Sequence, residues 1–250
     1  MIATTTEKKT NAVPLELRWE RGSSLPRRWV IPDGRRNKVT ALVNEAELPF
    51  DFSLAMSSLC ADVSARCELL THVQMPRVLV SFTPCRNRSR FGLQARVTPM
   101  RFRHGALMRR HGSIQYQVQR FFVENREMLY LLTFCLPRFL DQPFEEKLIT
   151  IFHELYHISP DFDGDLRRHA GRCAVHSHSK ANYDSHMAEL ARDYLVDHPN
   201  PEVFAFLHDS YRDLWDRNGG IFGVVIPRPK LLPVGWPTVY EAARNQKKSK

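Results

Sequence analysis

The stretch PFEEKLITIFHELYHI, residues 143–158, decides the fold because it predicts a helix that carries the chain's most specific chemical motif. Its apolar residues recur at three- and four-residue spacing, as in a helix that buries one face. Pro143 suits a first helical turn, and Asp141 or Gln142 is the expected N-cap. Two glutamates follow in that turn, where the helix dipole favours acidic side chains. We therefore expect a well-formed helix over these residues.

The residues before this helix predict another helix and then a sheet. Residues 52–73 have apolar side chains at roughly helical spacing, and Asp51 or Ser53 is the expected N-cap. Pro99 indicates that its strand lies at an edge of the sheet or bulges there. Short runs rich in Val, Phe, Tyr and Leu predict an antiparallel sheet of three or four strands. These runs are residues 77–82, 91–102, 114–122 and 128–134.

The residues after this helix predict further helices, so the expected fold class is α+β, with helix, sheet and then helices. The expected later elements are helices at 180–197 and 201–217 and a last strand at 221–227. A length of 250 residues suits one large domain or two small ones. We expect three segments along the chain. They are a loosely ordered basic N-terminal segment (1–38), a single folded domain (39–227) and a basic C-terminal tail (228–250).

The composition predicts a cytoplasmic protein without a membrane span. No stretch approaches the ~20 apolar residues that a membrane helix needs, and the N-terminus lacks the apolar region of a secretory signal. The five cysteines are an odd number and include no C-x-x-C pair, so we expect reduced thiols rather than disulfides or a zinc ribbon.

The motif in the central helix is H-E-x-x-H, and its spacing points to a zinc site. His153 and His157 are four residues apart, which places both imidazoles on one helix face, one turn apart. Two such nitrogens can reach a single zinc ion at ~2.0–2.1 Å. Glu154 lies beside the first histidine, where it can take a proton from a water molecule as general base. An ordinary amphipathic helix with exposed histidines is the alternative interpretation.

Catalytic zinc takes three protein ligands and a water molecule, so a third ligand must come from elsewhere in the chain. We favour His176, because it precedes the helix expected from residue 180 and a loop there can fold back over the motif. His169 and His178 are the nearest alternatives. Glu189 is another, since some zinc hydrolases take a glutamate from the next helix, but its distance from His157 in sequence makes a solvated helix face the better interpretation.

A family resemblance adds to this interpretation. The run LITIFHELYHISPDFDGDLRRHAGR, followed by His, Ser and Tyr-Asp, resembles the zinc metallopeptidases of the phage-type, SprT-like kind within the zincins, over residues 127–185. The resemblance implies a zincin-like fold in which an antiparallel sheet packs against the H-E-x-x-H helix, with Zn²⁺ as cofactor. His176 fits the histidine that follows Gly-Arg in that pattern. In zincins an edge strand binds the extended substrate, and we expect residues 128–134 in this role, with a buried central strand as the alternative.

An arginine-rich segment supports a second hypothesis. Residues 69–123 contain ten arginines and no Lys, Asp or Glu, and guanidinium groups bind phosphates and carboxylates in bidentate fashion. The alternative function is therefore a nucleic-acid-binding protein that uses residues 77–120, with a structural or vestigial zinc site. The leading expectation is a zinc-dependent metallopeptidase, a hydrolase of protein or peptide substrates with Glu154 as general base. SprT-like proteases can act on DNA-bound proteins, so the two hypotheses are compatible.

Overall fold

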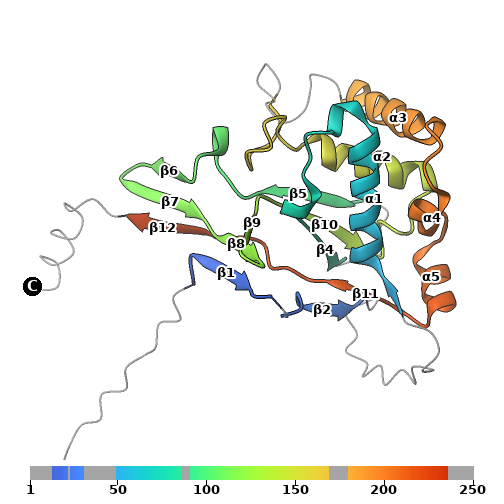
Figure 1. Ribbon diagram of the computed structural model, residues 1–250, viewed down its shortest axis with the longest axis horizontal. Coiled ribbons are helices and arrows are strands. Elements are labelled where there is room, and N and C mark those ends of the chain that lie inside the picture. Colours follow the sequence, from blue (N-terminus) through green and yellow to red (C-terminus); the bar gives the residue numbers. More distant parts are fainter. Residues whose placement is uncertain (1–12, 22, 31–48, 86–90, 169–179, 236–250) are drawn as a thin grey trace, which may run out of the picture.

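A central three-stranded sheet organises the structure, a computed structural model that describes residues 13–21, 23–30, 49–85, 91–168 and 180–235 (Figure 1). The strand order is β4 (Val78–Pro84), β10 (Tyr130–Leu136) and β5 (Ala95–Pro99). β10 runs parallel to β4 and antiparallel to β5, so the sheet is mixed rather than antiparallel as expected. The fold class is α+β, with the helices gathered at one end of the molecule and a β arm extending from the other.

The position of β10 corrects one sequence expectation. Residues 128–134 are expected to be the edge strand, with a buried central strand as the alternative. β10 lies between two neighbours and is almost completely buried, so the alternative is confirmed. Its nearly continuous apolar run reflects this burial on both faces. The edge strand beside the motif helix is instead β5, whose last residue is Pro99. The expectation that Pro99 belongs to an edge strand is therefore confirmed.

Two helices cover one face of this sheet. In α1 (Phe52–Arg66) the Asp51 carboxylate accepts a hydrogen bond from the Leu54 N–H at 3.1 Å, which confirms one of the two expected caps. The helix ends seven residues before the expected boundary at residue 73, and a short 3₁₀ turn follows it.

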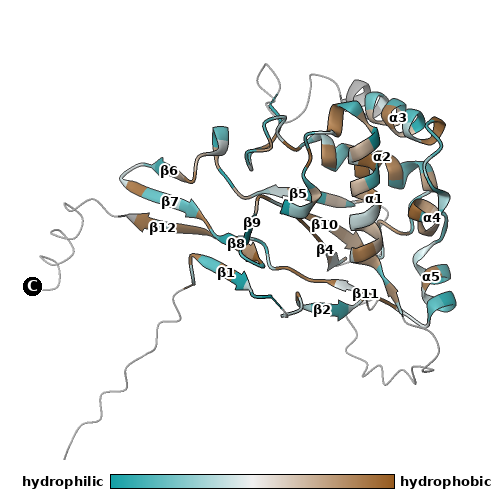
Figure 2. Ribbon diagram, viewed as in Figure 1, coloured by the Kyte–Doolittle hydropathy of each residue, from teal (hydrophilic) through white to brown (hydrophobic). Residues whose placement is uncertain are grey.

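The apolar residues concentrate in β10 and the adjoining helix faces, whereas β1 (Glu16–Trp19) is largely hydrophilic (Figure 2).

The motif helix, α2 (Phe144–Tyr156), begins differently from the expectation. Its N-cap is Pro143, which has no side chain that can accept a hydrogen bond, so neither Asp141 nor Gln142 is the cap. The Asp141 carboxylate instead accepts the Tyr211 N–H at 3.2 Å, which ties the start of α2 to a later helix. A tertiary contact has therefore replaced the local one that the sequence predicts.

Of the two helices expected near the C-terminus, one is present as expected and the other is two shorter helices. α3 (Lys180–Val196) matches the expectation closely. The helix expected at 201–217 is a short α4 (Pro201–Phe204), a 3₁₀ turn and α5 (Tyr211–Asn218). The break comes at Ser210, whose hydroxyl and Asp213 carboxylate form a capping box that starts a new helix.

Strands also occur in the two terminal segments, although residues 1–38 are expected to be loosely ordered and residues 228–250 to be a basic tail. β1 pairs in parallel with β8 (Arg120–Val123). β2 (Arg27–Trp29) pairs with β11 (Ile221–Val224), the expected last strand. β12 (Leu231–Gly235) pairs with β7. The remaining strands are β3 (Phe50–Asp51), β6 (Met108–His111), β7 (Ile114–Val118) and β9 (Arg126–Met128).

None of the helices in the described part of the chain combines the length and apolar character that crossing a bilayer requires.

The junction between α5 and β11 gives a testable prediction. Gly220 has a φ of 142°, and a β-carbon there would lie 2.4 Å from Cζ3 of Trp29. Gly219 also has a positive φ, 66°, but a β-carbon there would meet nothing within 4 Å. We expect Gly220→Ala to lower the free energy of unfolding by about 2–3 kcal/mol and Gly219→Ala by only ~1 kcal/mol. Urea denaturation of both variants tests this difference, and equal losses would contradict it.

Candidate metal and catalytic site

The two motif histidines converge at the C-terminal end of α2. His153 lies in the last turn and His157 directly follows the helix as its C-cap. Their Nε2 atoms are 2.9 Å apart, and the two rings are nearly perpendicular, at 82°. Two histidine nitrogens bound to one tetrahedral zinc ion would be about 3.4 Å apart, given zinc–nitrogen bonds of ~2.0–2.1 Å. A separation ~0.5 Å wider needs only small side-chain rotations, so this pair fits a shared metal ion.

Glu154 is buried beside this pair and contacts the edge strand. Its side chain is 8% exposed, and its Oε2 accepts the main-chain N–H of Val97 in β5 at 2.6 Å. Burial raises the pKa of the Glu154 carboxyl to about 7, against the opposing effects of the Val97 N–H and the Arg96 charge. A carboxyl group with a pKa near neutrality exchanges protons readily at neutral pH, which is the property a general base needs.

The predicted third ligands are only partly within the described structure. His169, His176 and His178 lie outside the described residues. Glu189 is described on α3, where its carboxylate is 62% exposed and lies 3.9 Å from Nδ1 of His186. Within residues 13–168 and 180–235, apart from the gaps given above, no three His, Cys, Asp or Glu side chains are grouped to hold a metal ion. The structure therefore brings His153 and His157 together and does not bring Glu189 to them.

A buried lysine fixes the N-terminal half of α2, and the sequence reasoning missed it. Lys147 is 2% exposed and its Nζ donates to the main-chain oxygens of Leu207 and Asp209 at 2.8 and 2.6 Å. Burial lowers the pKa of this ammonium group to about 8. The signal available in the sequence was a lysine beside Leu148 on the apolar side of the helix. Its two bonds hold α2 against the turn that precedes α5.

The segment after α2 is fastened to the central sheet by a buried tyrosine. The Tyr130 hydroxyl on β10 donates to the Asp165 main-chain oxygen at 2.8 Å and accepts the Gly164 N–H at 3.0 Å. The Arg167 N–H donates to the His157 main-chain oxygen at 2.7 Å. The Tyr130 bonds hold the chain that leaves the motif against β10, and the Arg167 N–H fixes the main-chain oxygen of His157.

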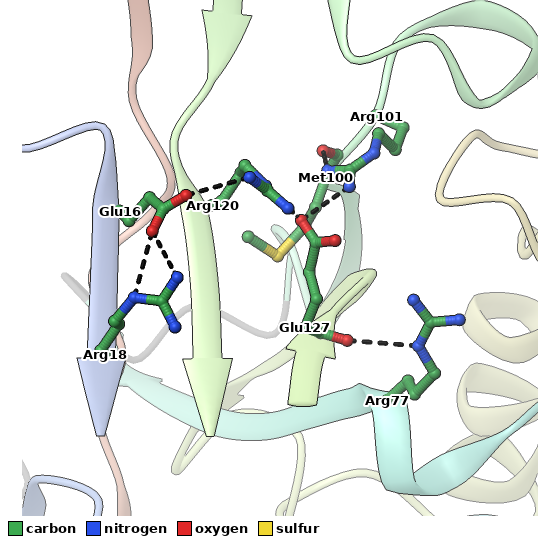
Figure 3. Close-up of polar contacts among 7 residues, drawn as sticks. All are labelled: Glu16, Arg18, Arg77, Met100, Arg101, Arg120 and Glu127. Carbon is green, nitrogen blue, oxygen red and sulfur yellow. Dashed lines mark hydrogen bonds and ion pairs between the residues drawn. The ribbon is translucent and has the colours of Figure 1, made fainter. Parts of the chain in front are cut away.

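Several arginines of the 77–120 segment are engaged by one glutamate (Figure 3). The Glu127 Oε1 accepts hydrogen bonds from Arg101 Nη2 and Arg120 Nε, each at 2.6 Å. Arg77 donates to the Glu127 main-chain oxygen at 3.2 Å, and Arg120 also contacts Glu16 at 2.9 Å. Burial raises the pKa of Glu127, but the two guanidinium groups outweigh it and hold the pKa below its ordinary value. Nucleic-acid binding by this segment stays a prediction, and these three arginines are already occupied.

The two motif histidines thus converge as the helical spacing predicts, while the zinc site and the resemblance to SprT-like zinc metallopeptidases stay predictions from the residues. Comparison with known proteins adds no relative from which a role could be transferred: no family model matches the chain, and neither the curated proteins nor the solved structures gave a match.

Proposed function

We propose that this protein is a zinc-dependent metallopeptidase with a zincin-like arrangement of its α+β fold. His153, His157 and His176 would hold the zinc ion, and Glu154 would be the general base. One observation carries the proposal: the Nε2 atoms of His153 and His157 converge to 2.9 Å beside a buried carboxyl group on the same helix. Zinc bound there supplies Lewis acidity to a water molecule and to a substrate carbonyl group.

Glu154 moves the proton in this proposal. Its Oε2 is held by the Val97 N–H, so Oε1 is the oxygen placed to take a proton from the attacking water. The same carboxyl group then delivers that proton to the nitrogen of the cleaved peptide bond, which leaves as an amine. Burial of Glu154 and of its neighbours Phe152 and Leu155 excludes bulk water from this proton transfer.

The edge strand supports a peptide as the substrate. β5 pairs with β10 along one side only, among the described strands. On the other side the Val97 N–H is donated to Glu154 and Pro99 has no N–H, so an extended chain would bind this edge mainly through the main-chain oxygens of β5. β5 also contacts the general base directly through Val97. A peptide aligned with β5 would therefore lie next to the residues proposed to cleave it, in the role that the sequence assigned to residues 128–134.

Metal content tests the proposal directly. We expect elemental analysis of protein purified without added metal to find about one zinc per chain, lost in His153→Ala and in His176→Ala. His111→Ala is the matched control, because His111 is exposed at the end of β6, in the β arm away from α2 (Figure 1). This control should keep the zinc. A folded wild-type protein without zinc would overturn the proposal, and loss of zinc only in the His169→Ala or His178→Ala variant would reassign the third ligand.

A further inference from the structure

The central sheet has a second face, directed away from α1 and α2. Along β10 the side chains alternate between faces, as in any strand. Tyr130, Leu132 and Phe134 belong to the large core under the helices, whereas Leu131 belongs to a separate, smaller core on the other side. On this second face lies a pocket of about 380 Å³. It opens on the opposite face of the sheet from Glu154, and its Arg96 acts on the Glu154 carboxyl only through its charge.

Cationic and hydroxyl side chains line this pocket above an apolar floor. The floor includes Leu131 and Ile226, which are 1% and 6% exposed. The register of β10 with β5 places Arg96 opposite Thr133 and Thr98 opposite Leu131. The polar lining consists of Thr83, Arg96, Thr98, Thr133 and Arg228. No Asp or Glu is among the described residues that line the pocket.

Most of these donors are available to a ligand. The Thr133 hydroxyl lies 3.1 Å from the Ser81 hydroxyl, so it is engaged within the sheet. The side chains of Arg96 and Arg228 form no ion pair with a carboxylate of the described residues. Arg101 and Arg120, by contrast, both form an ion pair with Glu127. Two unneutralised guanidinium groups on one concave surface create a positive potential that attracts an anion.

The chemistry of the lining selects the kind of anion. Guanidinium groups bind phosphate in bidentate fashion, and threonine hydroxyls can donate to further phosphate oxygens. The pocket volume falls within the range of ~300–1,000 Å³ typical of small-molecule sites. The apolar floor suits a ligand with an apolar body. We propose that this pocket binds a small phosphate monoester, with its phosphate group on Arg96 and Arg228 and its apolar part on Leu131 and Ile226.

Calorimetric titration of the full chain with phenyl phosphate tests this proposal. We expect saturable binding to the wild type, weakened about 10- to 100-fold in Arg96→Gln and in Arg228→Gln. Arg103→Gln is the matched control, because it removes one exposed positive charge of the same segment outside the pocket. That variant should bind like the wild type. Circular dichroism establishes that each variant is folded, and Arg228→Gln carries the test alone if Arg96→Gln does not fold.

Three further titrations distinguish phosphate binding in this pocket from binding at the motif histidines, from binding of any carboxylate, and from binding of nucleic acid. His153→Ala should bind phenyl phosphate unchanged, whereas loss of binding would place the ligand at the motif histidines and overturn the pocket. Benzoate should bind at least ten-fold more weakly than phenyl phosphate, and equal affinity would overturn the preference for phosphate. A single-stranded oligonucleotide that binds more tightly than phenyl phosphate and depends equally on Arg103 would overturn it in favour of a nucleic-acid surface. Because the pocket does not require zinc, it can fail or succeed independently of the proposed function.

Discussion

Replacing Glu154 with Gln is expected to lower the rate of peptide hydrolysis by about 10²- to 10⁴-fold and to leave the zinc bound. The glutamine side chain has nearly the same shape, and its carbonyl oxygen can still accept the Val97 N–H that Glu154 accepts at 2.6 Å. What it cannot do is take a proton. The measurement is kcat on a peptide mixture, together with zinc content per chain, for the wild type and the variant.

Glu189→Gln is the control for this experiment. It removes a carboxylate that is 62% exposed on α3, so both hydrolysis and zinc content should stay at wild-type values. If Glu154→Gln retained wild-type hydrolysis, Glu154 could not be the general base. If Glu154→Gln lost its zinc along with activity, the carboxyl group would act in metal binding or folding rather than in proton transfer. The two readouts therefore separate a chemical role from a structural one.

Phe134→Ala is expected to lower the free energy of unfolding by about 3–5 kcal/mol. Phe134 lies on β10 and is 0% exposed, and its ring centroid is 4.7 Å from that of Phe139 and 5.6 Å from that of Phe52. Removing the ring would leave a cavity where the central sheet, α1 and the turn before α2 meet. That cavity cannot close without moving elements that other contacts hold in place. Urea denaturation at equilibrium gives the value.

Phe91→Ala is the chemically matched control for Phe134→Ala, because Phe91 is 90% exposed. Its effect should stay within about 0.5 kcal/mol, as for most surface substitutions. Similar losses in the two variants would mean that the aromatic cluster of Phe52, Phe134 and Phe139 is not the packing centre of the domain.

The sequence predicted the helices well where their signals are local. α2 follows from its apolar spacing, and the approach of His153 to His157 follows directly from the helical period. α3 also follows from its period. The break at Ser210 was missed because the apolar pattern continues through residues 201–217, and only the capping box with Asp213 reveals a new start.

The arrangement of the strands was less predictable, because pairing depends on residues far apart in the chain. Nothing local to residues 128–134 shows that β4 and β5 flank them on both sides. The contact between Glu154 and Val97 joins residues 57 positions apart, so the strand that touches the general base could not be identified from the motif. The same holds for Glu127, whose role as a common acceptor for Arg101 and Arg120 appears only when two strands and a loop meet.

The bond from Val97 to Glu154 makes the alignment of β5 a chemical requirement as well as a packing one. A slip of one residue would turn Arg96 or Thr98 towards the apolar core and Val97 towards solvent. A slip of two residues in one direction would place Pro99 at the position of Val97, and proline has no N–H to donate. The register of β5 therefore decides which residue faces Glu154 and whether that residue has an N–H to donate. Insertions or deletions between residues 91 and 107 are compatible with the motif only where Val97 remains opposite Leu132.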